Sequence, residues 1–383
     1  MRVAILESIV MPAGHEVEFD RILVEEFKNQ GHKPIFFVPQ NYPFKFDYKT
    51  EIVYLEGGEA ISYAGVGKLK KIWLSLQREQ RRIAWFNDIC KKAKKGLCDA
   101  IVIPTSSWRG LRSVLKSDLK ESPVPVLIIL HGIMPRDKMH LIEGVKTCAP
   151  FKNIHIADLG LQTLADFDEL TGYQNFHTLL GPVYKPFDLQ ITPEFNIHEP
   201  IKLGFFGQYR KEKNLSFFLE AFCKAKFSRE VELLVQGATV TKADSDDFER
   251  LTKLYSSNKS IRFLHKNLLG IEWQKELMGI DILLLPYAAE RYRYQPSAML
   301  FTAIGYYKPV LQSPEMNPEI LSEFMIGEAV ELDTVEKFSK QLEVFMNTFD
   351  DKQEIYKKCL IEANQKYSHE NLIKNILNIL SKC

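Results

Sequence analysis

Short runs of β-branched and other apolar residues alternate with longer helical stretches, and this alternation constrains the fold more than any other feature. Strands that alternate with helices form parallel sheets covered by helices. The pattern predicts strands at 3–7, 34–38, 52–55, 100–103, 126–130, 153–157 and 176–180, and again at 201–206, 232–235, 261–264, 282–285 and 309–312. It predicts helices at 16–30, 68–95 and 161–171, and an almost wholly helical tail from 335 to 383.

The alternation stops once, at a stretch without periodicity that contains Pro182, Pro186, Pro193 and Pro200. Proline fixes φ and lacks a backbone N–H, so such a stretch is typical of a linker. A chain of 383 residues also exceeds the size at which a single core stops growing. We therefore predict two Rossmann-like, doubly wound domains that face a cleft, over 1–185 and 186–365, with a terminal helix at 366–383 that packs back on the first.

Composition and charge narrow the class of protein. The 50 Lys and Arg balance 49 Asp and Glu, and a net charge of +1 gives no overall attraction to nucleic acid. Glu7 interrupts the first apolar run, which is typical of a buried strand rather than a signal peptide, and no run reaches the roughly 20 apolar residues of a membrane-spanning helix. The six cysteines are scattered without a CxxC pair, as in reduced cytosolic proteins. A cytoplasmic protein is expected.

Familiar cofactor and nucleophile motifs are missing from the sequence. The segment Gly65–Lys68 has Ser62 in place of the first Gly of a Walker loop and Leu69 in place of its Ser or Thr. No GxGxxG follows the first strand, no GxSxG marks a hydrolase nucleophile, and no HExxH marks a zinc site. The sequence therefore predicts neither a bound cofactor nor a metal centre.

An anion-binding corner is predicted where two strands of the second domain end. The first strand ends at Gly207, and Arg210 and Lys213 then precede a helix; the second ends at Pro286, and another helix begins near Ser297. Glycine allows a ligand to approach the backbone, and helix N-termini and cations attract negative charge. The loop between Pro286 and Ser297 also carries Glu290, Arg291 and Arg293. The alternative is that the cations only solvate the start of a helix.

In this order and spacing the two stretches resemble the donor-binding half of the GT-B glycosyltransferases, especially the retaining family 4 group, over most of residues 201–382. Lys213 stands six residues after Gly207, as the family's phosphate-binding Lys does. Lys308-Pro309-Val310 matches the family's Lys-Pro-Val. The resemblance implies that the donor is bound by Gly207, Arg210, Lys213, Ser297, Ala298 and Met299.

The chain departs from the family at three positions. Counted back from Lys308, the glutamates of the family's Glu-x7-Glu segment fall at Tyr294 and Thr302. The family's Arg is replaced by Gln208, and Arg210 stands close enough to take its place. In the family, one of these carboxylates holds the nucleotide ribose and the other faces the donor sugar. The resemblance therefore supports the pyrophosphate contacts in this chain better than the ribose and sugar contacts. Glu290 is the candidate catalytic replacement, with a solvated loop charge as the alternative.

In the first half, the buried strand that ends at Leu130 is followed by His131, as in the same family, where a His lies near the transferred sugar. The resemblance implies that His131 hydrogen-bonds the sugar or the donor phosphate, and a purely structural His is the alternative. Gly14 and His15 belong to the loop after the first strand, where the family contacts acceptor and phosphate. They are the candidate residues on the acceptor side.

Asp244-Ser245-Asp246 has the DxD spacing with which another class of glycosyltransferases holds a divalent metal. Short polar side chains also cap helices, and a polar helical stretch follows from 247 to 255. We favour the capping interpretation.

Residues 68–95 form a basic amphipathic stretch in which ten cations face only two acids and are interleaved with Ile72, Trp73, Leu76, Trp85 and Phe86. Such a helix can bind an anionic membrane surface. The alternative is a surface helix whose apolar residues pack inward. No nucleic-acid reader motif accompanies the stretch, so nucleic acid is not an expected partner.

Taken together, the residues and the resemblance predict an enzyme of the hexosyltransferase type in polysaccharide biosynthesis. It would move a sugar from a UDP- or GDP-linked donor to a glycan, glycolipid or glycoprotein, with retention and without a metal. It would be cytoplasmic, either free or peripheral on the inner face of the membrane. The alternative is a non-catalytic GT-B subunit that binds glycan or stabilises a partner glycosyltransferase; the missing glutamates favour it, whereas the retained Arg210 and Lys213 favour the enzyme.

Overall fold

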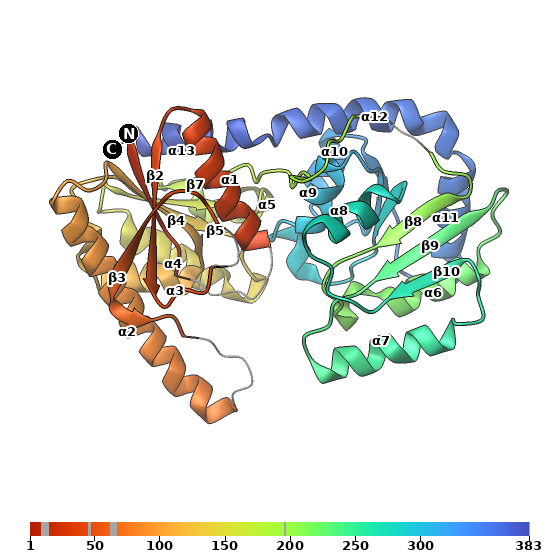
Figure 1. Ribbon diagram of the computed structural model, residues 1–383, viewed down its shortest axis with the longest axis horizontal. Helices are drawn as coiled ribbons and strands as arrows, with labels where there is room; N and C mark the ends of the chain where they lie inside the picture. The colour runs from red at the N-terminus through yellow and green to blue at the C-terminus, as the bar shows by residue number, and fades with distance from the viewer. Residues whose placement is uncertain (9–14, 45–46, 62–66, 195–196, 383) are drawn as a thin grey trace. The chain divides into compact units, whose positions relative to one another are not determined.

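The computed structural model describes residues 1–8, 15–44, 47–61, 67–194 and 197–382, and the chain forms two compact units (Figure 1). The first unit contains Met1–Pro182 and Ser368–Cys383, and the second contains Val183–Tyr367. The chain therefore passes from the first unit to the second and returns at its end.

The first unit is built on a sheet of seven parallel strands in the order β3-β2-β1-β4-β5-β6-β7. Its strands are β1 (Arg2–Leu6), β2 (Lys33–Gln40), β3 (Glu51–Glu59), β4 (Ala100–Ser106), β5 (Val126–Leu130), β6 (Ile154–Asp158) and β7 (Phe176–Thr178). The central strands are buried on both faces, which is why they are continuous apolar runs without alternation. The order reverses between β1 and β4, and ligands bind at such reversals in open α/β sheets.

Helices cover this sheet on both sides. They are α1 (His15–Asn29), α2 (Lys68–Lys94), α3 (Trp108–Leu115), α4 (Lys138–Cys148), α5 (Gln162–Asp166) and α13 (His369–Leu380). The last of these comes from the end of the chain and lies beside α1 (Figure 1). The Gln30 amide donates to the Glu370 carbonyl oxygen at 3.1 Å, so the C-terminal helix completes the cover of the first sheet.

The second unit repeats the architecture with six parallel strands in the order β10-β9-β8-β11-β12-β13. Its strands are β8 (Ile201–Phe205), β9 (Val231–Gln236), β10 (Ile261–Leu264), β11 (Ile282–Leu285), β12 (Val310–Gln312) and β13 (Gly327–Ala329). Its helices are α6 (Leu215–Lys224), α7 (Lys242–Leu254), α8 (Gly270–Met278), α9 (Ala298–Gly305), α10 (Pro318–Glu323), α11 (Val335–Asn347) and α12 (Phe349–Lys366). Here the strand order reverses between β8 and β11.

The predicted fold class of two doubly wound sheets is confirmed, with two local differences. The predicted helix 161–171 is interrupted at Phe167, whose φ of −119° and ψ of 74° are not helical. The strand β13 was not expected, because three residues are too few to show a period of two. It pairs with β12 where Gly327 approaches the Val310 backbone so closely that a Cβ would lie 1.9 Å from its carbonyl oxygen.

Candidate functional site

The strand reversal of the second unit brings Gly207, Lys213 and Met299 together. Gly207 follows β8 and has φ of +103°, which residues with a side chain rarely adopt. A Cβ at this position would lie 3.2 Å from the Lys213 Nζ and 3.5 Å from the Met299 Sδ. An open stretch of backbone, an ammonium group and the first turn of α9 therefore meet at one point.

The backbone at Gly207 is held by a buried amide that sequence reasoning missed. The Gly207 N–H donates to the Gln236 Oε1 at 2.9 Å, and the Gln236 Nε2 donates to the Lys266 carbonyl oxygen at 2.5 Å. Gln236 is the last residue of β9 and is 1% exposed. The one available signal was a polar residue at the end of an apolar strand. Its amide ties the turn after β8 to the turn after β10.

Lys213 is a buried cation. It ends a short 3₁₀ turn (Lys211–Lys213) ahead of α6 and is 7% exposed. Its Nζ lies 4.6 Å from the centre of the Tyr287 ring, and within the described part of the chain it has no hydrogen-bond or ion-pair partner. Burial, together with the charges of Arg210 and Arg291, lowers the pKa of Lys213 to about 7. An anion bound beside this ammonium would replace the hydration that folding removed.

Two guanidinium groups share one carboxylate next to Lys213. The Glu212 carboxylate pairs with Arg291 and lies 3.6 Å from the Arg210 Nη1. The Arg210 Nη2 also donates to the Gln208 Oε1 at 3.0 Å, so Gln208, at the family's Arg position, orients Arg210. The structure therefore brings Arg291, from the predicted loop after β11, together with Arg210 and Lys213.

The first turn of α9 completes the corner. The Ser297 Oγ accepts a hydrogen bond from the Leu300 N–H at 3.4 Å, and the Ser297 N–H donates to the Asn317 Oδ1 at 2.9 Å. Ser297 is thus the N-cap, and both its backbone N–H and its hydroxyl oxygen have partners within the chain. The backbone N–H groups of Ala298 and Met299 have no acceptor among the described residues, and such groups attract anions at helix N-termini.

The positions where the family has glutamates do not supply a replacement. The Thr302 hydroxyl donates to the Ala298 carbonyl oxygen at 2.8 Å within α9, and Thr302 is buried. Tyr294 is the C-cap of a 3₁₀ turn (Glu290–Arg293). Glu290 is exposed at the start of that turn and takes no part in the contacts around Lys213.

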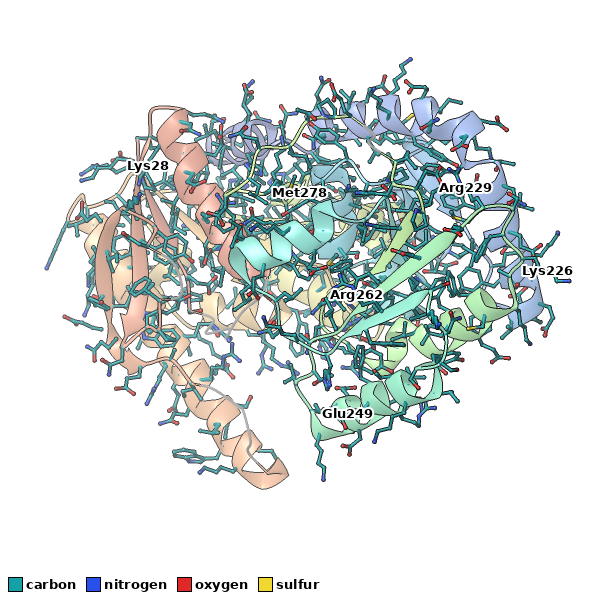
Figure 2. The ribbon with its side chains drawn as sticks, turned by 45° about the vertical axis from the view of Figure 1, so that its right-hand side comes forward. Lys28, Lys226, Arg229, Glu249, Arg262 and Met278 are labelled. Atoms are coloured by element: carbon teal, nitrogen blue, oxygen red, sulfur yellow. The ribbon has the colours of Figure 1, made fainter. Side chains whose placement is uncertain are left out.

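The matched Lys of Lys-Pro-Val is a capping residue. The Lys308 Nζ donates to the carbonyl oxygens of Met278 at 3.2 Å and Ile280 at 2.6 Å, and Met278 is the last residue of α8 (Figure 2). A cation at this place satisfies carbonyl groups that the helix end leaves without partners. Its resemblance to the family therefore reflects the packing of α8 rather than a ligand contact.

In the first unit, His131 follows β5 at the carboxyl edge of the sheet. Its Nε2 donates to the Pro104 carbonyl oxygen at 2.9 Å, and the centres of the His131 and Phe19 rings are 4.9 Å apart in an edge-to-face arrangement. The next residue, Gly132, has φ of +82° and donates its N–H to the Asp158 Oδ1 at 3.0 Å. Burial raises the pKa of Asp158 to about 7.

Of the predicted acceptor-side residues, Gly14 lies outside the described residues and His15 begins α1.

The DxD segment lies inside a helix. Thr241 is the N-cap of α7, where its Oγ1 accepts from the Asp244 N–H at 3.1 Å and donates to the Asp244 carboxylate at 2.6 Å. The helix therefore starts before the predicted stretch, and the cap is Thr241 rather than an Asp or Ser. Across the ranges that the structure describes, no three His, Cys, Asp or Glu side chains are grouped to hold a metal ion.

The two ends of α2 differ. Near its C-terminus Trp85 and Phe86 are each 1% exposed and pack inward, whereas near its N-terminus Ile72, Trp73 and Leu76 are 63%, 60% and 59% exposed. Figure 1 shows the start of α2 projecting beyond the sheet of the first unit. The inward-packing interpretation therefore holds for only half of the helix. No helix among the described residues is long and apolar enough to cross a bilayer.

Neither a protein-family model nor a curated protein sequence matches this chain. Solved structures do, over the full length of both chains. The Anabaena protein HepE in complex with UDP has a TM-score of 0.71 at 12% identity, with 100% of both chains covered. The lipopolysaccharide outer core galactosyltransferase WaaB in its apo form has a TM-score of 0.67 at 14% identity, also with 100% of both chains covered.

A third similar structure is the α,α-trehalose-phosphate synthase (UDP-forming) from Burkholderia xenovorans in complex with glucose-6-phosphate. Its TM-score is 0.68 at 10% identity, and 100% of both chains is covered. The likeness extends across both units, with a seven-stranded and a six-stranded parallel sheet. The chain has the two-domain GT-B fold.

Proposed function

We propose that this protein is a glycosyltransferase of the hexosyltransferase type and that its second unit binds a UDP-linked sugar. The observation that carries the proposal is the buried Lys213 ammonium beside the open backbone of Gly207 and the first turn of α9. Solved structures of the same fold hold UDP or UDP-glucose, which supports a uridine donor.

The corner suits a leaving nucleoside diphosphate. As the bond between the anomeric carbon and the diphosphate oxygen breaks, negative charge grows on that oxygen, and Arg210, Lys213 and the N–H groups of α9 stabilise it. The acceptor oxygen bonds to the same face of the carbon, and the acceptor proton passes to the leaving diphosphate. The configuration is retained and no protein carboxylate attacks. Because the positive charge comes from side chains, we propose that neither a metal nor a cofactor is required.

We place the acceptor on the first unit, with Gly14 and His15 on the acceptor side of the reaction. We propose that His131 hydrogen-bonds the transferred sugar or the donor phosphate, and its position at the carboxyl edge of a central strand supports this role. Glu290 is not part of the proposal, because its exposed carboxylate lies outside the contacts around Lys213.

A donor panel tests the proposal. The purified protein is incubated with UDP-glucose, UDP-galactose or GDP-mannose and a mixture of glycan and glycolipid acceptors, with and without EDTA. The release of nucleoside diphosphate and the configuration of the new glycosidic bond are measured. We expect release from one UDP-sugar, undiminished by EDTA, and a product of unchanged configuration. Binding of glycan without binding or turnover of any nucleotide-sugar would instead support the non-catalytic subunit. Turnover of GDP-mannose alone would move the donor to the guanosine class.

We also propose that the exposed start of α2 binds an anionic membrane surface. Ile72, Trp73 and Leu76 are exposed there, the exposed Lys70 precedes them, and the sequence around them is basic. Apolar side chains enter the boundary between headgroups and acyl chains while Lys and Arg attract anionic lipids. This surface would bring the enzyme to a lipid-linked acceptor.

Vesicle flotation tests this surface. The double substitution Ile72→Gln and Trp73→Gln is expected to weaken binding to phosphatidylglycerol vesicles by about tenfold or more, because two apolar side chains no longer enter the bilayer. Met139→Gln is the control, since Met139 is 69% exposed in the same unit but lies outside α2. Equal binding to neutral phosphatidylcholine vesicles, or an equal loss in the control, would contradict the proposal.

A further inference from the structure

The turn after β8 and the loop after β11 are joined to each other. The Ala288 N–H donates to the Glu212 carbonyl oxygen at 3.1 Å, and the Arg291 guanidinium pairs with the Glu212 carboxylate. The Arg291 side chain is 20% exposed, and its Nε is buried without a hydrogen-bond partner among the described residues. The Arg291 guanidinium therefore has at least one N–H donor that is not used, in surroundings from which most water is excluded.

The charges here do not balance. Glu212 faces Arg291 and Arg210, and Lys213 lies close enough for all three of these charges to affect its pKa. When Lys213 is protonated, three cations face one carboxylate, which leaves an excess of two positive charges. A nucleoside diphosphate supplies negative charge of about this size, whereas Glu212 alone does not.

Two tyrosines fix the distance between the buried ammonium and Arg291. The Lys213 Nζ lies 4.6 Å from the centre of the Tyr287 ring, and the Tyr287 and Tyr292 rings are 5.0 Å apart. The Arg291 guanidinium lies 4.9 Å from the Tyr292 ring centre and donates to its hydroxyl at 3.1 Å. Both tyrosines are buried, so the Lys213 ammonium and the Arg291 guanidinium each pack against an aromatic ring that is itself held in place.

We infer that Arg291 is a ligand of the donor's diphosphate and that Glu212 occupies its guanidinium until a phosphate takes the place of the carboxylate. The inference rests on the proposed function of the second unit and adds to it a third phosphate-binding residue. A guanidinium binds phosphate through two parallel hydrogen bonds, so exchange of one anion for another preserves its geometry. Arg291 thereby supplies the guanidinium that Gln208 does not.

Calorimetric titration with inorganic pyrophosphate, UDP and uridine tests the inference. Arg291→Gln is expected to weaken the binding of pyrophosphate and UDP by about tenfold or more, the usual effect of a lost charge-assisted hydrogen bond, and to leave uridine unchanged. Glu212→Gln is expected to strengthen pyrophosphate binding severalfold, because the competing carboxylate is gone. Arg293→Gln is the matched control, since Arg293 belongs to the same turn but pairs with Glu315.

The outcomes separate the inference from the proposed function. An equal effect of Arg291→Gln and Arg293→Gln on UDP overturns the inference and leaves the donor site standing. If pyrophosphate binds in a way that depends on Arg291 but UDP does not bind, Arg291 is a phosphate ligand and the proposed UDP-linked donor is wrong. Absence of pyrophosphate binding in the wild-type protein overturns the inference, and weaker binding by Glu212→Gln overturns the exchange.

A second variant is used if Arg291→Gln does not fold properly. If Arg291→Gln melts well below the wild-type protein, Arg291→Lys takes its place in the titration, because Lys keeps the charge and loses the planar fork. A loss of severalfold for pyrophosphate in Arg291→Lys supports the bidentate contact. Unchanged affinity in that variant overturns it.

Discussion

Lys213→Met is expected to raise the melting temperature of the free protein and to reduce sharply the further rise that UDP produces. The substitution keeps the volume of the side chain and removes a buried ammonium whose desolvation destabilises the fold. UDP affinity falls by roughly 100-fold, the effect of a lost charge-assisted contact in a water-poor site. Thermal melts with and without UDP measure both changes, because a ligand stabilises the state that binds it.

The gain in stability depends on pH with a defined sign. The pKa of Lys213 is lowered from 10.5 to about 7 in the folded chain, so between these values the unfolded chain binds more protons. Wild-type stability therefore rises with pH across this window, and the advantage of the variant is largest below pH 7 and disappears above about 10.5. A variant advantage that grows with pH would contradict the burial of a charged Lys213.

Binding should also take up a proton. At pH 8 a Lys213 with a pKa of about 7 is mostly neutral in the free protein, and a bound diphosphate raises that pKa by opposite charge. Titrations of UDP in buffers of different ionisation enthalpy are expected to show uptake of close to one proton. Lys211→Met, an exposed neighbour in the same turn, is the control and should change neither the affinity nor the uptake.

Gly305→Ala is expected to destabilise the second unit by about 3 kcal/mol, because the new methyl group has no room. A Cβ on Gly305 would lie 2.1 Å from the Tyr184 carbonyl oxygen and 2.7 Å from its carbon. That backbone cannot easily move away, since the Tyr184 N–H donates to the Phe301 carbonyl oxygen at 3.3 Å. The last turn of α9 is itself held, since the Asn364 amide donates to the Ile304 carbonyl oxygen at 3.0 Å.

Calorimetry checks this expectation on the transition that UDP raises, which identifies the second unit. A loss of about 3 kcal/mol corresponds to a fall of roughly 6–12 °C for a domain of this size. Gly172→Ala is the control, since a Cβ there meets nothing within 4 Å and its effect should stay within about 0.5 kcal/mol. If both substitutions lower the melting temperature equally, α9 does not approach the Tyr184 backbone as closely as described.

Much of the fold could be predicted because its signals are local. Strands buried on both faces of a parallel sheet are continuous apolar runs, so segments such as Val126–Leu130 and Ile282–Leu285 are recognisable without a structure. The boundaries of α2 and the helical character of the tail follow from periodicity in the same way. The three-residue strand β13 and the break at Phe167 were not predicted, since each is shorter than the stretch of sequence in which a period can be recognised.

The candidate site could be predicted only in part. Gly207 and Lys213 stand within one strand–turn–helix unit, so their spacing alone placed them at a strand end. Gln236 and Lys308 act through partners about 30 residues away, and no local pattern marks an amide or an ammonium that will bond to a distant carbonyl. Thr302 looked like a lost ligand position, and the structure instead gives its hydroxyl a bond inside α9.

The order of apolar runs was enough to predict the fold class and the division of the strands into two sheets, and the spacing of Gly207, Arg210 and Lys213 predicted an anion-binding corner. Local patterns could not show that Arg291 joins these cations while Arg293 of the same loop pairs with Glu315, because Glu212, the partner of Arg291, lies 79 residues away. The physical reason is the strand order: β8 and β11 are neighbours in the sheet although β9 and β10 separate them in the chain. Periodicity in the sequence indicates which residues are buried. The order of strands in the sheet decides which loops are adjacent, and so which charged side chains interact.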